Sequence, residues 1–180
     1  MDNFDRHSHW ENIYKTKQAN EVGWYQPVPL TSLQILEQFN IPVTAKIIDV
    51  GGGDSFFVDH LLDLGYQDIT VLDISETAIL RAKERLGDAA EKVKWLVADA
   101  ANFKPAEKYD FWHDRAAFHF LTRDSEVESY IDTVQHSMNP EGILIIGTFS
   151  INGPKKCSGI DIRQYSEDSM VEQLKKYFHK

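Results

Sequence analysis

The chain has 180 residues, 42% of them hydrophobic and 26% charged, which is ordinary for a globular domain with a hydrophobic core. No apolar run approaches the roughly 20 residues that span a bilayer, and residues 1–5 resemble neither a signal peptide nor a transit peptide. We therefore expect a cytoplasmic protein with no membrane partner. The net charge of −9 and the short, scattered basic clusters disfavour nucleic acid as a ligand. The single cysteine, Cys157, cannot form an internal disulfide, which agrees with a reducing compartment.

The first 29 residues are rich in aromatic side chains. Residues 9–17 can form a short helix with Trp10 and Tyr14 four positions apart, hence on one face, and the pair Trp24-Tyr25 follows. These rings either fill part of the core or form a lid that presents flat surfaces to a ligand. An amphipathic helix is expected next, over residues 31–39, with Thr31 or Ser32 as its N-cap.

From Lys46 onward, apolar segments typical of buried strands alternate with amphipathic segments typical of helices. We expect strands at 46–50, 69–74, 93–97, 109–113 and 143–149. Helix starts are expected at Asp54 or Ser55, at Ser75 with a stop at Gly87, at a Ser125–Glu128 capping box, and at Ser166 for a last helix through Phe178. A turn at 139–142 and a loop at 150–165 complete the chain. This alternation predicts an α/β fold, doubly wound and Rossmann-like, with a mainly parallel sheet, and we expect residues 1–180 to form a single domain.

The stretch from Ile47 to Ser55 combines a buried strand with a glycine turn. The apolar run contains Asp49 near its end, and Gly51–Gly53 follow before a predicted helix start. A strand, a glycine turn and a helix N-terminus allow the backbone to approach a ligand closely. Ligands of open α/β sheets bind at the carboxyl ends of the strands, and this chain carries an acid at four successive strand ends: Asp49, Asp73, Asp99 and Asp114.

Asp73 follows the glycine turn by twenty residues, where an acid can accept hydrogen bonds from both hydroxyls of a ribose. A dinucleotide fingerprint would need a glycine at position 56, and Phe56 is too bulky for the close helix–strand packing, which disfavours a nicotinamide oxidoreductase. The acid, the two spaced glycines and Ser55 instead suit a nucleoside that carries an amino-acid tail. The Asp49 carboxylate could then act on an ammonium group directly or through water.

With these residues the chain resembles class I S-adenosylmethionine-dependent methyltransferases over residues 9–178. Asp49–Ser55 is similar to the first motif of that family, with Ser55 at the position of its usual third glycine. Asp73 is similar to the acid that holds the ribose, and Asp99 with Ala100 to the pair that meets the adenine. The resemblance implies methyltransferase activity, with S-adenosyl-L-methionine as cofactor and S-adenosyl-L-homocysteine as product. It also implies cofactor contacts from Asp49, Gly51, Gly53, Asp73, Ile74, Asp99 and Ala100.

A narrower resemblance is to the group that contains protein-lysine methyltransferases acting on elongation factor 1A and on citrate synthase. It implies further cofactor contacts from Trp10, Tyr14, Tyr25 and Arg115. The segment 157–166 is similar to uncharacterised bacterial members of the same group. Because these residues lie on the cofactor side, they do not identify the acceptor, which is expected to be a protein, with lysine as one candidate, or a small molecule.

An enzyme that transfers a methyl group from a sulfonium mainly supplies position and desolvation, and aromatic rings favour the cationic centre. The acceptor should lie over the ends of the fourth and fifth strands, near Arg115, Phe118, His119, Phe120, Phe149, Arg163 and Tyr165. Of these, His119 alone titrates near neutral pH, and it is either a catalytic base or a packed histidine at a helix start. The remaining histidines lack a metal-like spacing with acids or cysteines, so we expect no metal site.

Two strands that class I methyltransferases usually carry after the last helix have no counterpart in this sequence, so we expect either a shortened member of the family or a truncated form. The fifth strand should then expose an edge, which favours association, and we expect a partner chain or a second copy to cover it. An alternative from a different class of function is a protein that binds S-adenosylmethionine without transferring its methyl group.

Overall fold

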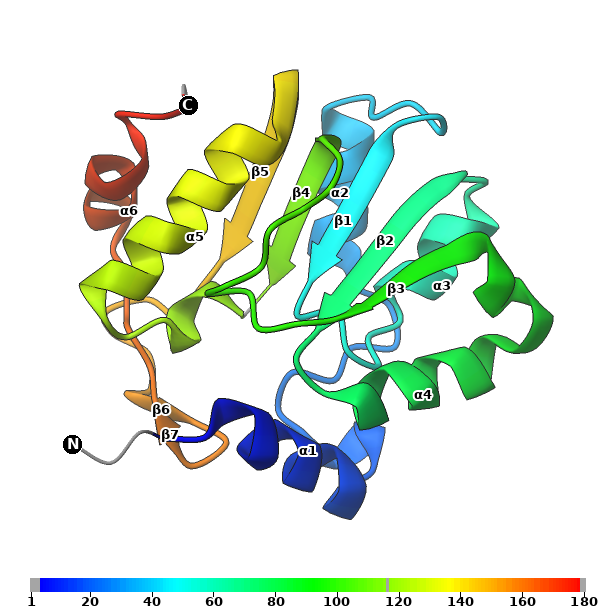
Figure 1. Cartoon of the computed structure of the whole chain (residues 1–180), viewed down its shortest axis with the longest axis horizontal. Helices are drawn as coiled ribbons and strands as arrows, with labels where there is room; N and C mark the ends of the chain where they lie inside the picture. The colour runs from blue at the N-terminus through cyan, green and yellow to red at the C-terminus, as the bar shows by residue number, and fades with distance from the viewer. Residues whose placement is uncertain (1–3, 116, 179–180) are drawn as a thin grey trace.

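A computed structural model describes residues 4–115 and 117–178 (Figure 1). Five parallel strands form one sheet in the order β3-β2-β1-β4-β5. Their bounds are Lys46–Val50 (β1), Asp68–Asp73 (β2), Val93–Val97 (β3), Tyr109–Arg115 (β4) and Met138–Gly147 (β5). The strand order reverses beside β1, so the carboxyl ends of β1 and β4 form the switch point at which doubly wound sheets bind ligands. The predicted α/β fold with a mainly parallel sheet is confirmed.

Helices cover both faces of this sheet and its carboxyl edge. Helices α2 (Leu30–Gln38) and α3 (Phe57–Asp63) lie behind the sheet in Figure 1, and α5 (Asp124–Ser137) and α6 (Glu167–Leu174) lie on the opposite side. Helix α1 (Arg6–Thr16) lies below the strand ends, next to α4 (Glu76–Leu86). Short 3₁₀ turns occur at Ala19–Glu21 (η1), Gly87–Lys92 (η2) and Phe118–Phe120 (η3). In the described part of the chain, no helix combines the length and the apolar character needed to cross a bilayer.

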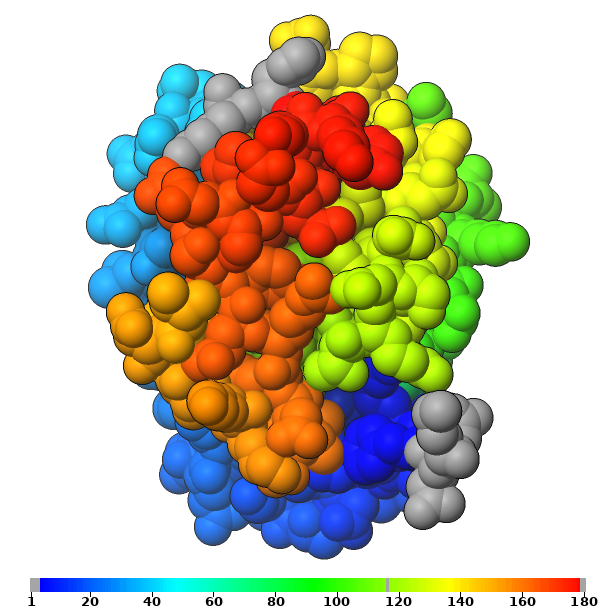
Figure 2. Space-filling model, turned by 90° about the vertical axis from the view of Figure 1, so that its left-hand side faces the viewer, coloured from blue at the N-terminus to red at the C-terminus, as the bar shows by residue number. Residues whose placement is uncertain are grey.

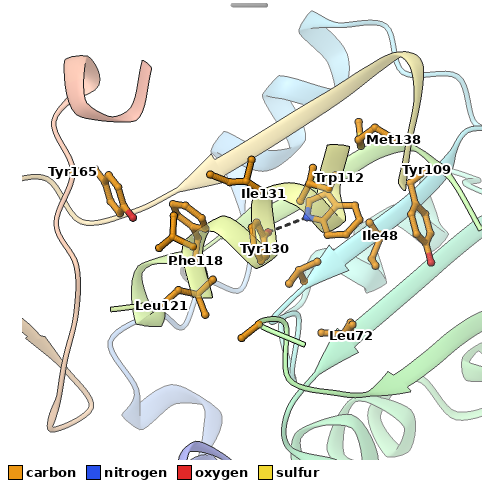
Figure 3. Packing of buried hydrophobic residues seen from close by; sticks show 14 residues of the cluster. Ile48, Leu72, Tyr109, Trp112, Phe118, Leu121, Tyr130, Ile131, Met138 and Tyr165 are labelled. Atoms are coloured by element: carbon orange, nitrogen blue, oxygen red, sulfur yellow. Dashed lines mark hydrogen bonds between the residues drawn. The ribbon is translucent and has the colours of Figure 1, made fainter. Parts of the chain in front are cut away.

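The core has two halves because side chains alternate between the faces of the sheet. Ile48 and Trp112 point toward α5 and pack against Tyr130 and Ile131 (Figure 3). Ile47, Ile69, Val71 and Phe111 lie on the other face and pack against the buried sides of α2 and α3. The apolar runs that predicted buried strands are thus the residues that hold both helical layers.

Helix α2 begins one residue before its predicted start. Pro29 occupies the cap position of α2, and no side chain caps the helix there. Ser32, one of the two predicted caps, is 3% exposed, and its hydroxyl lies 2.8 Å from Nε2 of His113. The prediction of Thr31 or Ser32 as N-cap is therefore wrong, because the serine hydroxyl is used by a core histidine.

Helix α3 begins at Phe57, later than the predicted start at Asp54 or Ser55. The glycine turn continues through Phe56, although Ser55 Oγ still accepts a hydrogen bond from the backbone N–H of Phe57 at 3.2 Å. The cap predicted at Ser75 is confirmed, since its Oγ accepts from the backbone N–H of Ala78 at 3.2 Å.

The capping box of α5 is displaced from the predicted Ser125–Glu128 pair. The helix begins at Asp124, and the Glu126 side chain accepts a hydrogen bond from the backbone N–H of Arg123 at 3.3 Å. Ser166 caps α6 as predicted, but that helix ends at Leu174, before the predicted end at Phe178.

The predicted turn at 139–142 lies inside β5. Tyr109 pairs with Met138 and Phe111 pairs with Ile143, so residues 139–142 form an irregularity in the ladder, with Glu141 at a φ of +66°. The expected loop at 150–165 contains a small antiparallel hairpin, β6 (Lys156–Cys157) and β7 (Ile160–Asp161). Figure 2 shows this hairpin (orange) beside the N-terminal helix (blue).

The far edge of the sheet is open in the described part of the chain. Strand β5 pairs with β4 only, and residues 142–147 are half-buried. An apolar strand with an unpaired edge can associate with another chain. That a partner chain or a second copy covers the edge of β5 stays a prediction.

Gly52 provides a test of the packing at the switch point. A Cβ at this position would lie 2.6 Å from Asp49 Oδ2 and 2.8 Å from Val71 Cγ1, so Gly52→Ala should lower the free energy of unfolding by about 1–3 kcal/mol. Gly23→Ala is the control, because no heavy atom lies within 4 Å of its added Cβ. Urea denaturation followed by circular dichroism measures both, and equal stability of the two variants would contradict the packing argument.

Candidate functional site

A cavity of about 650 Å³ lies where the carboxyl ends of the strands face α1. Residues at the ends of four strands border it: Gly51 after β1, Asp73 with Ile74 at β2, Arg115 at β4 and Gly147 at β5. Because these segments are far apart in sequence, the fold itself brings the cavity walls together. Its size and position are those of a small-molecule site at a topological switch point.

The glycine turn forms one wall of this cavity, and both space and backbone conformation require its glycines. Gly51 and Gly53 have φ angles of +69° and +48°. A Cβ at Gly51 would lie 2.7 Å from the Cβ of Ala117. A Cβ at Gly53 would lie 2.7 Å from Tyr14 Oη and 2.9 Å from Asp73 Oδ2. Larger residues at either position would displace the groups around the cavity.

Asp73 brings a buried carboxylate to the cavity. It is 4% exposed and accepts a hydrogen bond from the backbone N–H of Ser75 at 2.8 Å. Burial raises the pKa of Asp73 to about 7, and the neighbouring carboxylates of Asp54 and Asp49 add to this effect. Since a carboxylate accepts several hydrogen bonds, Asp73 has capacity left for the hydroxyl groups of a ligand.

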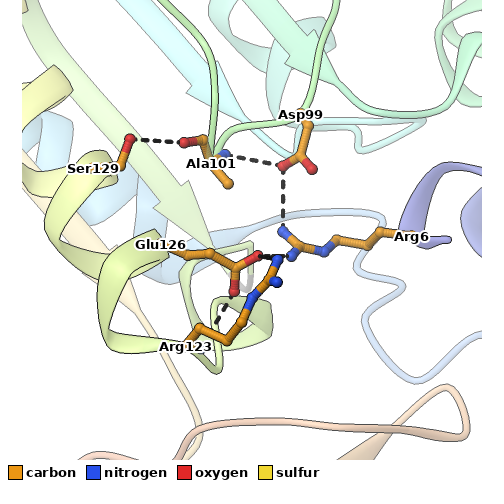
Figure 4. Close-up of polar contacts among 6 residues, drawn as sticks. All are labelled: Arg6, Asp99, Ala101, Arg123, Glu126 and Ser129. Atoms are coloured by element: carbon orange, nitrogen blue, oxygen red, sulfur yellow. Dashed lines mark hydrogen bonds and ion pairs between the residues drawn. The ribbon is translucent and has the colours of Figure 1, made fainter. Parts of the chain in front are cut away.

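Asp99 and Ala100 border the cavity on the adjacent loop, and an arginine of α1 reaches the same place (Figure 4). Arg6 Nη1 lies 3.3 Å from Asp99 Oδ1, which also accepts from the backbone N–H of Ala101 at 2.9 Å. The other guanidinium nitrogen of Arg6 pairs with Glu126 of α5. Burial disfavours the Glu126 carboxylate, yet hydrogen bonds from Arg123 and Arg6 lower its pKa to about 2. Arg6 therefore links α1 to both Asp99 and α5.

Aromatic rings of the N-terminal segment form the wall opposite the strand ends. The ring of Trp10 lies 4.9 Å from that of Phe120 and 5.7 Å from that of Trp24, both edge-on. Tyr14 lies 6.3 Å from Trp10 and from Trp24. All four residues border the cavity, so a cationic ligand there would meet several electron-rich rings.

Helix α1, which carries this wall, is docked on the N-terminus of α4. The Glu11 carboxylate accepts hydrogen bonds from Ser75 Oγ at 2.9 Å and from the backbone N–H of Thr77 at 3.0 Å. Burial would raise the pKa of Glu11, but the hydrogen bonds from Thr77 and Ser75 lower it to about 2. Arg81 adds a hydrogen bond to the carbonyl oxygen of Tyr14 at 3.0 Å. The sequence predicted a lid without these anchors, because Glu11 and α4 are more than sixty residues apart.

The far end of the cavity is closed by His119, Phe120 and Phe149. His119 is 0% exposed, and neither of its ring nitrogens has a hydrogen-bond partner among the described residues. Burial lowers the pKa of His119 to about 4, and the rings of Phe120 and Phe149 lie 4.3 Å and 5.1 Å away. At neutral pH this is an uncharged imidazole that could accept a hydrogen bond or a proton from a bound molecule.

Arg115 also borders the cavity, at the end of β4. Its Nη2 donates to the carbonyl oxygen of Trp24 at 3.2 Å, which ties β4 to the aromatic segment. Tyr25, the predicted member of the Trp24-Tyr25 pair, is 37% exposed and packs edge-on against Phe56 at 5.9 Å. The structure thus brings Trp24, and not Tyr25, to the cavity, because the ring of Tyr25 packs against Phe56.

Several other candidates also lie away from the cavity surface. Asp49 is 3% exposed and accepts a hydrogen bond from Nδ1 of His113 at 2.7 Å, and Gly53 lies beneath Tyr14. Among the acceptor-side candidates, Phe118 and Tyr165 are core residues, and Arg163 forms an ion pair with Asp124. The remaining predicted site residues all border the cavity: Trp10, Tyr14, Gly51, Asp73, Ile74, Asp99, Ala100, Arg115, His119, Phe120 and Phe149.

Comparison with known proteins agrees with this geometry. Residues 47–142, more than half of the chain, match the family model described as "Methyltransferase domain", so the chain belongs to this family. The eEF1A lysine and N-terminal methyltransferase of Mus musculus is 27% identical over 68% of this chain and 18% of its own length. A malonyl-[acyl-carrier protein] O-methyltransferase of Anoxybacillus flavithermus is 32% identical over 57% of this chain and 38% of its own length. The chain therefore spans less than half the length of either relative.

A solved structure supports the fold assignment independently of sequence. The structure described as a "DhpI-SAM-HEP complex" superimposes with a TM-score of 0.65 at 16% identity, over 94% of this chain and 87% of that one. At this identity the likeness concerns the fold.

Asp73 gives the site a testable dependence of stability on pH. An aspartate of the unfolded chain titrates near 3.8, so between about pH 4 and pH 7 the folded state binds more protons, and stability falls as pH rises through this window. Asp73→Asn removes the buried charge. The difference in unfolding free energy between the variant and the wild type should therefore rise by about 2–4 kcal/mol, in favour of the variant, from pH 4 to pH 8. Urea denaturation at pH 4, 6 and 8 measures the difference.

The control for this experiment is Asp63→Asn, which replaces an exposed carboxylate. Its difference from the wild type should stay constant across the same pH range. If the Asp73→Asn difference is equally constant, then the Asp73 carboxylate is not destabilised by burial.

Proposed function

We propose that this protein is a methyltransferase that uses S-adenosyl-L-methionine, with methyl transfer to a protein or small-molecule acceptor. The observation that carries the proposal is the meeting, in one cavity, of the glycine turn, the Asp73 carboxylate and the Asp99–Ala100 loop beneath an aromatic lid. Membership of the methyltransferase domain family and the named complex of the structural neighbour support the same cofactor.

The residues around the cavity fit each part of this cofactor. Asp73 can accept hydrogen bonds from ribose hydroxyls, and Asp99 with the backbone of Ala100 can recognise the adenine edge. Gly51 allows the turn to pass close to Ala117 at the cavity wall, where the methionine part can lie against its backbone. Trp10, Tyr14 and Trp24 cover the opposite side, with Trp24 in the role first assigned to Tyr25, and Arg115 can pair with a carboxylate. When bound, the cofactor supplies an activated methyl group on a sulfonium centre.

The chain's own contribution to transfer is then position, exclusion of water and proton handling. The aromatic wall excludes water from the sulfonium and offers it electron-rich rings. His119, uncharged at neutral pH, does not repel a cationic cofactor and can take up a proton as the acceptor is methylated. Its two unpartnered ring nitrogens at the closed end of the cavity support the prediction that it is the catalytic base.

The acceptor itself is the open part of this proposal. One relative's name refers to lysine and N-terminal methylation of a protein, and the other's to O-methylation of an acyl-carrier protein derivative. A protein acceptor, with lysine as one candidate, is compatible with the first relative. The aromatic end around His119 is also compatible with a small molecule. We retain both classes as candidates.

The experiment that tests the proposal combines binding with label transfer. Calorimetric titration should detect binding of S-adenosyl-L-homocysteine, and methyl-tritiated cofactor should label one component of a whole lysate that has been separated into protein and small-molecule fractions. Binding without transfer would favour the binding-only alternative, and absence of binding would contradict the proposal altogether. The labelled fraction identifies the class of acceptor.

His119→Asn should be assayed in the same way. Loss of a positioned base should lower the rate of label transfer by about 100-fold or more, while affinity for S-adenosyl-L-homocysteine stays within about twofold. His136→Asn, at an exposed position of α5, is the control and should leave both quantities unchanged. A full transfer rate in His119→Asn would assign this histidine a packing role only.

We also propose that a second copy of the chain covers the open edge of β5. The support is the apolar, half-buried strand whose outer edge has no strand partner in the described residues. Light scattering of the purified protein should give the mass of a dimer. A monodisperse monomer at micromolar concentration would contradict this.

A further inference from the structure

A buried chain of hydrogen bonds joins Ser32, His113 and Asp49, three residues that the cavity does not use. Nε2 of His113 lies 2.8 Å from Ser32 Oγ, and Nδ1 lies 2.7 Å from Asp49 Oδ1. The three side chains come from α2, from β4 and from the end of β1. In the sheet, Asp49 and His113 are direct partners in the register of the two central strands.

The environment of these three hydrogen-bonded residues differs from that of a nucleophilic serine. Ser32, His113 and Asp49 are 3%, 2% and 3% exposed, and none of them borders either of the two cavities described in the structure. The ring of His113 lies 4.4 Å from that of Phe57 and stacks on that of Phe111 at 6.3 Å. A serine without access to a substrate cannot attack one, so the role of the three side chains depends on the groups that they contact.

The Asp49 carboxylate contacts the glycine turn at Gly52. An added Cβ at Gly52 would lie 2.6 Å from Asp49 Oδ2 and 3.0 Å from its Cγ, so the carboxylate lies directly against the turn. Gly51, the preceding residue, borders the cavity. His113 binds the other carboxylate oxygen, and its hold on Asp49 therefore reaches the cavity wall through two adjacent glycines.

The hydrogen-bond roles in this chain follow from the chemistry of the groups. An ionised carboxylate only accepts, so Nδ1 of His113 carries a hydrogen and donates it to Asp49. In the neutral imidazole, Nε2 then accepts from the hydroxyl of Ser32. Ser32 thus fixes the orientation of the His113 ring, and the other ring nitrogen of His113 fixes the Asp49 carboxylate.

We propose that His113 is a positioning residue: it holds Asp49, and through Asp49 the turn 51–53, in the arrangement that receives the amino-acid tail of the cofactor. Ser32 is its second anchor, on α2. The inference rests on the proposed function, because it assigns the turn to the methionine part of S-adenosyl-L-methionine. It extends that function to two residues outside the cavity.

Two nucleosides separate this role from a general contribution to stability. S-adenosyl-L-homocysteine carries the amino-acid tail, whereas 5′-methylthioadenosine has the same adenosine and lacks that tail. His113→Asn can keep the bond to Asp49, because an asparagine amide nitrogen takes the place of Nδ1. In His113→Gln the amide lies near the place of Nε2, so the bond to Ser32 can be kept and the bond to Asp49 is lost.

The expected result in calorimetric titration is selective. His113→Gln and Asp49→Asn should lower affinity for S-adenosyl-L-homocysteine by about tenfold and affinity for 5′-methylthioadenosine by less than twofold. His113→Asn should restore most of the lost affinity. Phe111→Leu, a core substitution beside His113 that touches neither hydrogen bond, is the stability control and should leave the ratio of the two affinities unchanged.

Three other outcomes are possible, and each contradicts a different part of the proposal. If His113→Gln lowers both affinities equally, as a loosened core would, the positioning role is wrong. If Asp49→Asn is selective and His113→Gln is not, Asp49 acts without His113, and the inference fails while the proposed function stands. If the wild-type protein binds neither nucleoside, the proposed function fails, and this inference fails with it.

Discussion

Three carboxylates, Asp49, Asp73 and Asp114, are buried at the carboxyl ends of adjacent strands, and the surrounding structure is arranged to accommodate them. Burying a charge is costly unless hydrogen bonds replace its water. Each of the three carboxylates has different hydrogen-bond donors. His113 donates to Asp49, and Tyr130 donates to Asp114 at 2.6 Å. Asp73 accepts from the backbone N–H of Ser75, and of these three acids it is the one that borders the cavity.

The hydrogen-bond partners differ among these three aspartates, and so does the part of the structure that each one stabilises. Asp114 also accepts from the backbone N–H groups of Ala117 and Phe118 at 2.8 Å and 3.0 Å, which fixes the start of the segment that carries His119. Burial raises the pKa of Asp114 to about 6, and the hydrogen bonds from Tyr130, Phe118 and Ala117 oppose that rise. Asp73, which also has acidic neighbours, is the buried acid whose remaining acceptor capacity lies at the cavity.

The N-terminal segment completes the site by the same principle. Glu11 accepts hydrogen bonds at the N-terminus of α4, and Arg6 pairs with Asp99 and Glu126 (Figure 4). Arg6 and Glu11 thus hold α1 against Asp99, α5 and α4, which positions Trp10 over the strand ends.

The sequence by itself determined the parallel sheet, because buried strands and amphipathic helices differ in period and length. It also determined about half of the cavity wall, because Gly51, Asp73, Asp99 and Arg115 each lie at or just beyond the end of a predicted strand, and strand ends of a doubly wound sheet converge. Only the tertiary structure decided which member of the Trp24-Tyr25 pair faces the cavity, since the two aromatic residues are adjacent and the sequence pattern does not distinguish them. It likewise decided the partners of Arg6, Glu11 and His113, which lie more than sixty positions away in sequence. No local pattern encodes such pairings, because they depend on how the helices and strands pack in three dimensions.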